Sequence, residues 1–179
     1  MGIKIAGHSY KKAVAYFYTD KSDFKKTMND KLNLSQSFKD SKGQVVTKSL
    51  AWFDHISQVN TCALRVSYAL WASGAKFDGV RCKRFIGTFG KQKVILPSVA
   101  AEYKAVLDGE IVLKKYEQKI PAAEVQAGLK KKSGIILFSG GMSGATGHVT
   151  FYGNGTCVDI EANKYFAYTS AIYFWAMKP

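Results

Sequence analysis

The sequence predicts an α+β fold, in which N-terminal helices pack against an antiparallel sheet formed by the last third of the chain. Two observations indicate this layout. Apolar residues recur at helical spacing in the first half, whereas short β-branched and aromatic runs separated by glycines dominate the end. The 179 residues are 47% hydrophobic and include only three prolines, so the chain can bury a real core and has no proline-rich hinge. We therefore expect residues 1–179 to form a single domain.

The first half is predicted to be mostly helical. The signals are apolar stripes at i, i+3, i+4 and i+7, a proline suited to a first turn, and glycines just past a last turn. In chain order we expect a helix over residues 10–17, a short helix starting near Phe24 and Met28, a turn within residues 39–47, a helix over residues 98–108 closed by Gly109, and a short helix from Pro121 through Gln126.

A further helix is expected to begin at Cys62, with Asn60 or Thr61 as its N-cap and Gly74 just past its end. Backbone N–H groups at a helix start have no helical acceptor, and the helix dipole is positive there. Such a field favours a thiolate, which is the nucleophilic form of cysteine. Cys62 is therefore a candidate nucleophile, although a free cysteine is more commonly a small buried apolar residue.

The last third is predicted to form strands because β-branched and aromatic residues gather there between glycines. The glycine-rich segment 139–147 is expected to be a loop, either beside a substrate groove or simply a connection. The expected strands cover residues 135–138, 148–152, 156–161 and 171–177.

His148 is the best candidate for a general base among the three histidines. His8 lies near the terminus and His55 leads into the cysteine-bearing helix, so both are interpreted as surface or packing residues. His148 opens a predicted strand whose alternation points Val149 and Phe151 toward the core. A nucleophile on an early helix, packed against a sheet that carries its base, is the papain-like arrangement and is typical of cysteine hydrolases.

A carboxylate beside His148 is predicted from the hairpin that follows it. Residues 153–155 read Gly-Asn-Gly, and a two-residue turn at the first two of them sets His148 opposite Asp159. A turn at the last two sets His148 opposite Glu161 instead. A three-residue loop would put Ile160 there and weaken a catalytic triad. Geometry alone leaves Asp159 and Glu161 as equal candidates.

Three segments resemble the motifs of one family, the fourth family of the type VI secretion amidase effectors. Residues 60–70 (NTCALRVSYAL) look like its nucleophile motif, residues 147–151 (GHVTF) like its histidine motif, and residues 172–177 (IYFWAM) like its closing aromatic strand. The order and spacing of all three fit, and the cysteine motif is the specific part.

The resemblance implies a papain-like fold related to NlpC-type peptidases. It implies cleavage of Gram-negative peptidoglycan peptide stems at the γ-D-glutamyl–meso-diaminopimelate bond. Cys62 would be the nucleophile, His148 the base and Asp159 the orienting residue, because an aspartate eleven residues past the histidine is the family's arrangement. It also implies delivery by the type VI secretion machinery, action in the target-cell periplasm and inhibition by a cognate immunity protein.

Acyl transfer by such a site needs an oxyanion hole and no metal or organic cofactor. The backbone N–H of Cys62 is expected to be one donor, and Gln58 and Asn60 are the candidates for a second. Cys62, Cys82 and Cys157 fit no zinc spacing; they allow either one bridge, such as Cys82–Cys157, or three free thiols. The chain departs from the family in lacking the close cysteine pair that some members bridge near the C-terminus.

The charge of the chain fits either a solvated cationic surface or a polyanionic partner. Lysine and arginine number 26 against 13 aspartates and glutamates, for a formal net charge of +13. The basic residues are scattered, which favours a general field acting on cell wall or on an acidic inhibitor over a nucleic-acid motif. The apolar segment at the N-terminus is too short for a signal peptide, and no run of apolar residues is long enough to span a bilayer. We therefore expect synthesis in the cytoplasm, export without a cleaved signal, and no membrane insertion.

Two other functions fit the same residues. The first is a cysteine peptidase that acts on the producer's own wall or is carried by a phage, with the same chemistry. The second is a basic binding module in which Cys62 is only structural.

Overall fold

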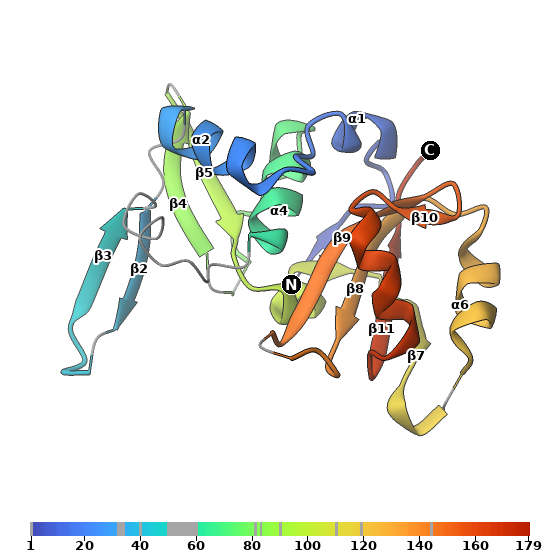
Figure 1. Ribbon diagram of the computed structural model, residues 1–179. Helices are drawn as coiled ribbons and strands as arrows, with labels where there is room; N and C mark the ends of the chain where they lie inside the picture. Colours follow the sequence, from blue (N-terminus) through green and yellow to red (C-terminus); the bar gives the residue numbers. More distant parts are fainter. Residues whose placement is uncertain are drawn as a thin grey trace.

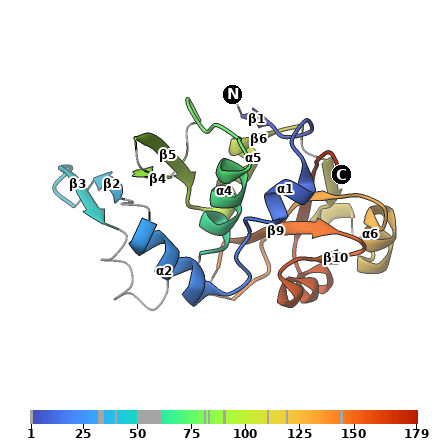
Figure 2. The same ribbon diagram turned by 90° about the horizontal axis from the view of Figure 1, so that it is seen from above.

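The computed structural model describes residues 2–31, 35–39, 41–49, 61–80, 82, 84–89, 91–109, 111–118, 120–143 and 145–179. Helices and antiparallel sheets both occur, and the α+β prediction is confirmed. In Figures 1 and 2 the β2–β3 hairpin lies at one end of the molecule and α6 at the other.

A five-stranded antiparallel sheet forms the C-terminal part (Figure 1). Its spatial order is β10-β9-β8-β11-β7, and every neighbouring pair is antiparallel. The predicted strands over 135–138, 148–152 and 171–177 are present. The strands are β7 (Ile111–Lys114), β8 (Gly134–Ser139), β9 (Gly147–Gly153), β10 (Thr156–Cys157) and β11 (Ala171–Ala176).

Both faces of this sheet are covered, because alternate side chains of each strand enter two different cores. Helix α4 (Cys62–Ala72) packs on one face, where Val149 and Phe151 point as predicted. On the other face lie α6 (Ala122–Leu129) and the 3-10 helix η3 (Ile160–Ala167). The sheet therefore holds α4 rigidly across the strand that carries His148.

Helix α4 begins at Cys62 and ends in a Schellman motif. Gly74 has a φ of +108°, its N–H donates to the Trp71 carbonyl, and the N–H of Ala75 donates to the Leu70 carbonyl. Thr61 occupies the N-cap position, one of the two predicted alternatives, but it adopts helical angles (φ −83°, ψ −1°) and its side chain makes no capping bond. Asn60, the other candidate cap, lies outside the described residues.

The prediction of a mostly helical first half is only partly right. Helices α1 (Tyr10–Val14) and α2 (Lys21–Lys31) occur where expected, but a four-stranded antiparallel sheet follows. Its side chains pack on α2 and α4 through Phe24, Met28 and Leu64, so tertiary pairing overrides weak local patterns. The strands are β2 (Ser35–Lys39), β3 (Val45–Ser49), β4 (Arg84–Phe89) and β5 (Gln92–Pro97), and the expected turn joins the first two.

Three of the expected elements are shorter than predicted. Helix α1 ends at Val14, whereas the predicted helix reached residue 17. The expected helix over residues 98–108 is split into η1 (Ala100–Glu102) and α5 (Tyr103–Val106), after which β6 (Leu107–Asp108) pairs with β1 (Ile3–Lys4). The expected strand over 156–161 ends at Cys157.

The early end of β10 has a local cause in the side chain of Asn163. Its Oδ1 accepts from the Cys157 N–H at 3.0 Å, and its Nδ2 donates to the Ile160 carbonyl at 2.9 Å. The amide thus ties β10 to η3, and the chain turns away from β9 after Val158, whose N–H donates to the Phe151 carbonyl at 2.9 Å.

The remaining predicted features concern membranes and cysteines. No helix among the described residues is both long enough and apolar enough to cross a membrane. Cys62, Cys82 and Cys157 are all free thiols, so the Cys82–Cys157 bridge is absent. Cys157 is buried in the core beneath η3, whereas Cys82 packs against the core around α4.

We predict that Gly74→Ala lowers the free energy of unfolding by about 1–2 kcal/mol, because a Cβ is disfavoured at positive φ. Gly128→Ala is the matched control: Gly128 lies in helix α6, and a Cβ meets nothing within 4 Å at either position. This control should raise the free energy by about 0.5–1 kcal/mol. Urea unfolding of both variants measures the two shifts; equal shifts would contradict the assigned backbone conformations.

Candidate active site

Cys62 and His148 meet where the N-terminus of α4 crosses the start of β9. Apolar side chains next to both residues, including Val66 and Val149, belong to one core and fix this crossing. The Cys62 side chain interacts with the imidazole of His148 and raises its pKa. The structure therefore brings together a thiol and an imidazole that lie 86 residues apart in the sequence.

The hairpin after β9 uses a type I′ turn. Asn154 and Gly155 both have positive φ (53° and 84°), and Thr156 pairs with Gly153. If β10 continued as a strand in this pairing register, Glu161 would lie opposite His148. Because β10 ends at Cys157, the chain leaves the ladder before that residue.

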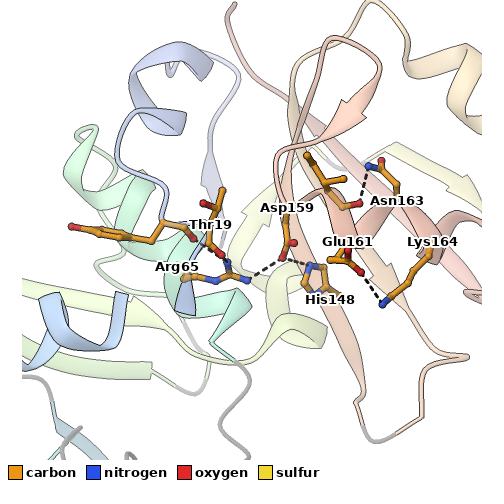
Figure 3. A network of polar contacts seen from close by, with 9 residues as sticks. Thr19, Arg65, His148, Asp159, Glu161, Asn163 and Lys164 are labelled. Atoms are coloured by element: carbon orange, nitrogen blue, oxygen red, sulfur yellow. Dashed lines mark hydrogen bonds and ion pairs between the residues drawn. The ribbon is translucent and has the colours of Figure 1, made fainter. Parts of the chain in front are cut away.

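Asp159, rather than Glu161, lies beside His148. Its Oδ2 is 3.5 Å from Nε2 of His148 (Figure 3), a separation at the outer limit of a hydrogen bond, so the contact is chiefly electrostatic. Glu161 has a side chain that is 85% exposed and pairs with Lys164 at 3.4 Å. The break in β10 thus delivers Asp159 to the imidazole in the register that would otherwise have favoured Glu161.

Cys62 and Asp159 shift the pKa of His148, and His148 in turn shifts the pKa of Asp159. Burial alone lowers the pKa of His148, but its interactions with Asp159 and Cys62 outweigh this effect and raise the pKa to about 9. The interaction with His148 lowers the pKa of Asp159, burial opposes this, and the charge of Arg65 lowers the pKa further. The imidazolium and the carboxylate are therefore the stable forms at neutral pH.

Arg65 and Tyr165 contact this group, and the sequence analysis assigned neither of them a function. Arg65 Nη2 lies 3.1 Å from Asp159 Oδ2 (Figure 3), and the Tyr165 ring centroid lies 5.0 Å from that of His148. A sequence signal for Arg65 exists: it is a charged residue one turn after Cys62, on a helix that is otherwise apolar at its start. No comparable signal marks Tyr165.

Of the three candidate oxyanion donors, only Cys62 lies within the described residues. Cys62 is the first residue of α4, where helix geometry leaves N–H groups without helical acceptors. Gln58 and Asn60 lie outside the described residues, as does His55.

An open groove over the sulfur is not visible in the described part of the chain. Cys62 is 1% exposed, and the residues just before it, 51–60, lie outside the described residues. A cavity of about 600 Å³ does occur, but it lies at the far end of α4, between Trp71, Phe77 and Phe89, and includes neither Cys62 nor His148. The candidate nucleophile Cys62 and the candidate base His148 therefore place the candidate active site at the α4–β9 crossing rather than in this cavity.

Comparisons with known proteins identify the family. The sequence model of "Type VI secretion system (T6SS), amidase effector protein 4" matches residues 58–175, more than half of the chain. The type VI effector Tae4 from Enterobacter cloacae, a solved crystal structure, is 19% identical with a TM-score of 0.59; the match covers 98% of this chain and 100% of that one.

Two effector–immunity complexes are also similar. The Tae4–Tai4 complex from Salmonella Typhimurium matches at 18% identity and a TM-score of 0.56, over 96% of this chain and 99% of that one. The Tae4–Tai4 complex from Enterobacter cloacae matches at 25% identity and a TM-score of 0.51, over 72% and 81%. These likenesses confirm the predicted fold. No curated protein matches the chain.

We predict that Asp159→Asn lowers the pKa of His148 from about 9 by about one to three units, because the anion that stabilises the imidazolium is lost. NMR titration of the imidazole signals measures the shift, with His148→Ala to assign the signal. Glu161→Gln is the matched control and should leave the titration in place, since Glu161 pairs with Lys164. A larger shift in the control would identify Glu161 as the interacting carboxylate.

Proposed function

Because the chain belongs to the type VI secretion system amidase effector protein 4 family, we propose that it is a cysteine amidase acting on peptidoglycan. Its substrate is the peptide stem, and the bond cleaved joins γ-D-glutamate to meso-diaminopimelate. The observation that carries the proposal is the contact between the Cys62 side chain and the His148 imidazole. Family membership supports the amide substrate, and this contact supports the cysteine chemistry.

The reaction begins with a thiolate–imidazolium pair. A pKa of about 9 keeps His148 protonated at neutral pH. In the proposed reaction this imidazolium stabilises the nucleophilic sulfur of Cys62. The sulfur attacks the γ-glutamyl carbonyl carbon and forms a C–S bond. The oxygen takes up the negative charge next to the N-terminus of α4, where N–H groups and the helix dipole stabilise it.

Collapse of this intermediate breaks the amide C–N bond, and His148 gives its proton to the departing amine of diaminopimelate. The imidazole is then neutral and accepts a proton from water, whose oxygen attacks the thioester. Breaking the C–S bond releases the γ-glutamyl acid and restores the thiolate–imidazolium pair. Asp159 holds the imidazole in place through both steps.

The charge of +13 supports an anionic surface as the site of action. A positive field concentrates the protein on the carboxylate-bearing wall and speeds association with an acidic partner. Two similar solved structures are complexes of an effector with the immunity protein Tai4. A cognate immunity protein therefore blocks this chain in the producer, and the type VI machinery delivers it to the periplasm of a target cell.

Cys62→Ala and His148→Ala should each reduce hydrolysis of purified Gram-negative sacculi by at least about 1,000-fold, because each removes a group that acts in every turnover. Mass spectrometry of the soluble fragments should identify the γ-D-glutamyl–meso-diaminopimelate bond as the one cut. Cys82→Ala is the control and should retain full activity. Undiminished hydrolysis by the Cys62 variant would refute the cysteine mechanism, and cleavage elsewhere in the stem would refute the assigned bond.

Expression with an export signal should lyse a Gram-negative host that lacks the immunity protein, whereas expression without the signal should be harmless. Lysis should disappear with Cys62→Ala. Live-cell counts after induction measure the difference. Export without lysis, by a protein that still digests sacculi, would favour an enzyme restricted to the producer's own wall; sacculus binding without hydrolysis would favour a binding module.

A further inference from the structure

Arg65 is the most deeply buried charged residue near the candidate triad, with 1% of its surface exposed. Its guanidinium meets partners from two distant parts of the chain. Nη1 donates to the carbonyls of Tyr18 and Thr19 at 2.9 and 2.8 Å, and Nη2 donates to Asp159 at 3.1 Å. The Phe17 ring lies below it, 5.2 Å from ring centroid to the guanidinium carbon.

These contacts use the planar fork that distinguishes arginine from lysine. A buried cation is stable only when hydrogen-bonded acceptors replace its water. Two carbonyls and one carboxylate do so here, and the aromatic face adds a cation–π contact. The guanidinium is thereby held in one orientation.

The same carboxylate oxygen faces both Arg65 and His148. Oδ2 of Asp159 lies 3.1 Å from Nη2 of Arg65 and 3.5 Å from Nε2 of His148. Asp159 itself lies between the end of β10 and the start of η3. Arg65 therefore supplies the rigid contact that determines where this oxygen lies relative to the imidazole.

The carbonyls that anchor Arg65 belong to a segment outside the region matched by the family model, which begins at residue 58. Residues 17–19 belong to the link between α1 and α2, and Thr19 lies beside Arg65 of α4 (Figure 3). Through Arg65, this N-terminal segment is connected to the triad.

We propose that Arg65 is a positioning residue of the amidase reaction. On the basis of the proposed function, Arg65 holds the Asp159 carboxylate against His148 and is itself held by the backbone carbonyls of residues 18 and 19. The N-terminal segment is thus part of the frame that makes the triad competent.

Arg65→Lys tests this proposal, because lysine keeps the charge but cannot span two carbonyls and a carboxylate. We expect kcat on sacculus fragments to fall about 10- to 100-fold with little change in KM. The pKa of His148, followed by NMR, should fall from about 9 toward its value in Asp159→Asn. Arg84→Lys is the matched control: Arg84 donates to the Val80 carbonyl, away from the triad, and this change should alter neither quantity.

A double-mutant cycle separates positioning from general stability. Arg65→Gln should reduce kcat strongly in the native background and by less than about threefold in the Asp159→Asn background, because the two residues act through one contact. Independent, multiplicative losses would overturn the proposal, as would an unchanged His148 titration in folded Arg65→Lys protein. The titration needs no substrate, so it also decides the matter if the native protein proves unable to cleave sacculi, which would refute the proposed function alone.

Discussion

The crossing of α4 over β9 is the contact on which the rest of the site depends. It places the first residue of the helix beside the second residue of the strand, and apolar packing around Val66 and Phe151 holds it there. A buried polar network fixes the rotation of the helix: the Ser67 hydroxyl lies 2.7 Å from the Pro97 carbonyl and 2.6 Å from the Tyr103 hydroxyl. Once the helix is fixed, the direction of the Cys62 side chain is fixed too.

A row of charged side chains leads to the same helix–strand crossing. Arg65, Asp159 and His148 alternate in sign from the N-terminal segment to the thiol, and each neighbour stabilises the charged form of the next. A buried imidazole would ordinarily lose its proton more easily. Here the carboxylate and the thiol reverse that effect, which connects the packing of the fold directly to the protonation state that a cysteine nucleophile requires.

The parts of the fold that could be predicted are those with strong local patterns. The helix start at Cys62, the Gly74 end signal and the alternation of β9 have short-range causes and occur as expected. The β2–β5 sheet and the early end of β10 depend on distant or side-chain partners, such as Phe24 and Asn163, which periodicity does not reveal. Sequence geometry therefore left Asp159 and Glu161 equal, and only the family resemblance favoured Asp159. Arg65 was missed because its partners at residues 18–19 and 159 are remote in sequence.

Access to the sulfur tests the account most directly, since Cys62 is 1% exposed. The other two cysteines serve as internal controls for labelling of Cys62. Burial raises the pKa of the Cys82 thiol and raises the pKa of the Cys157 thiol to about 12. Brief alkylation of the native protein with iodoacetamide at pH 6, followed by peptide mass mapping, should label Cys62 first, and His148→Ala should suppress that labelling. If Cys62 stays unlabelled until the protein unfolds while Cys82 reacts, the sulfur is sealed and cannot be the nucleophile.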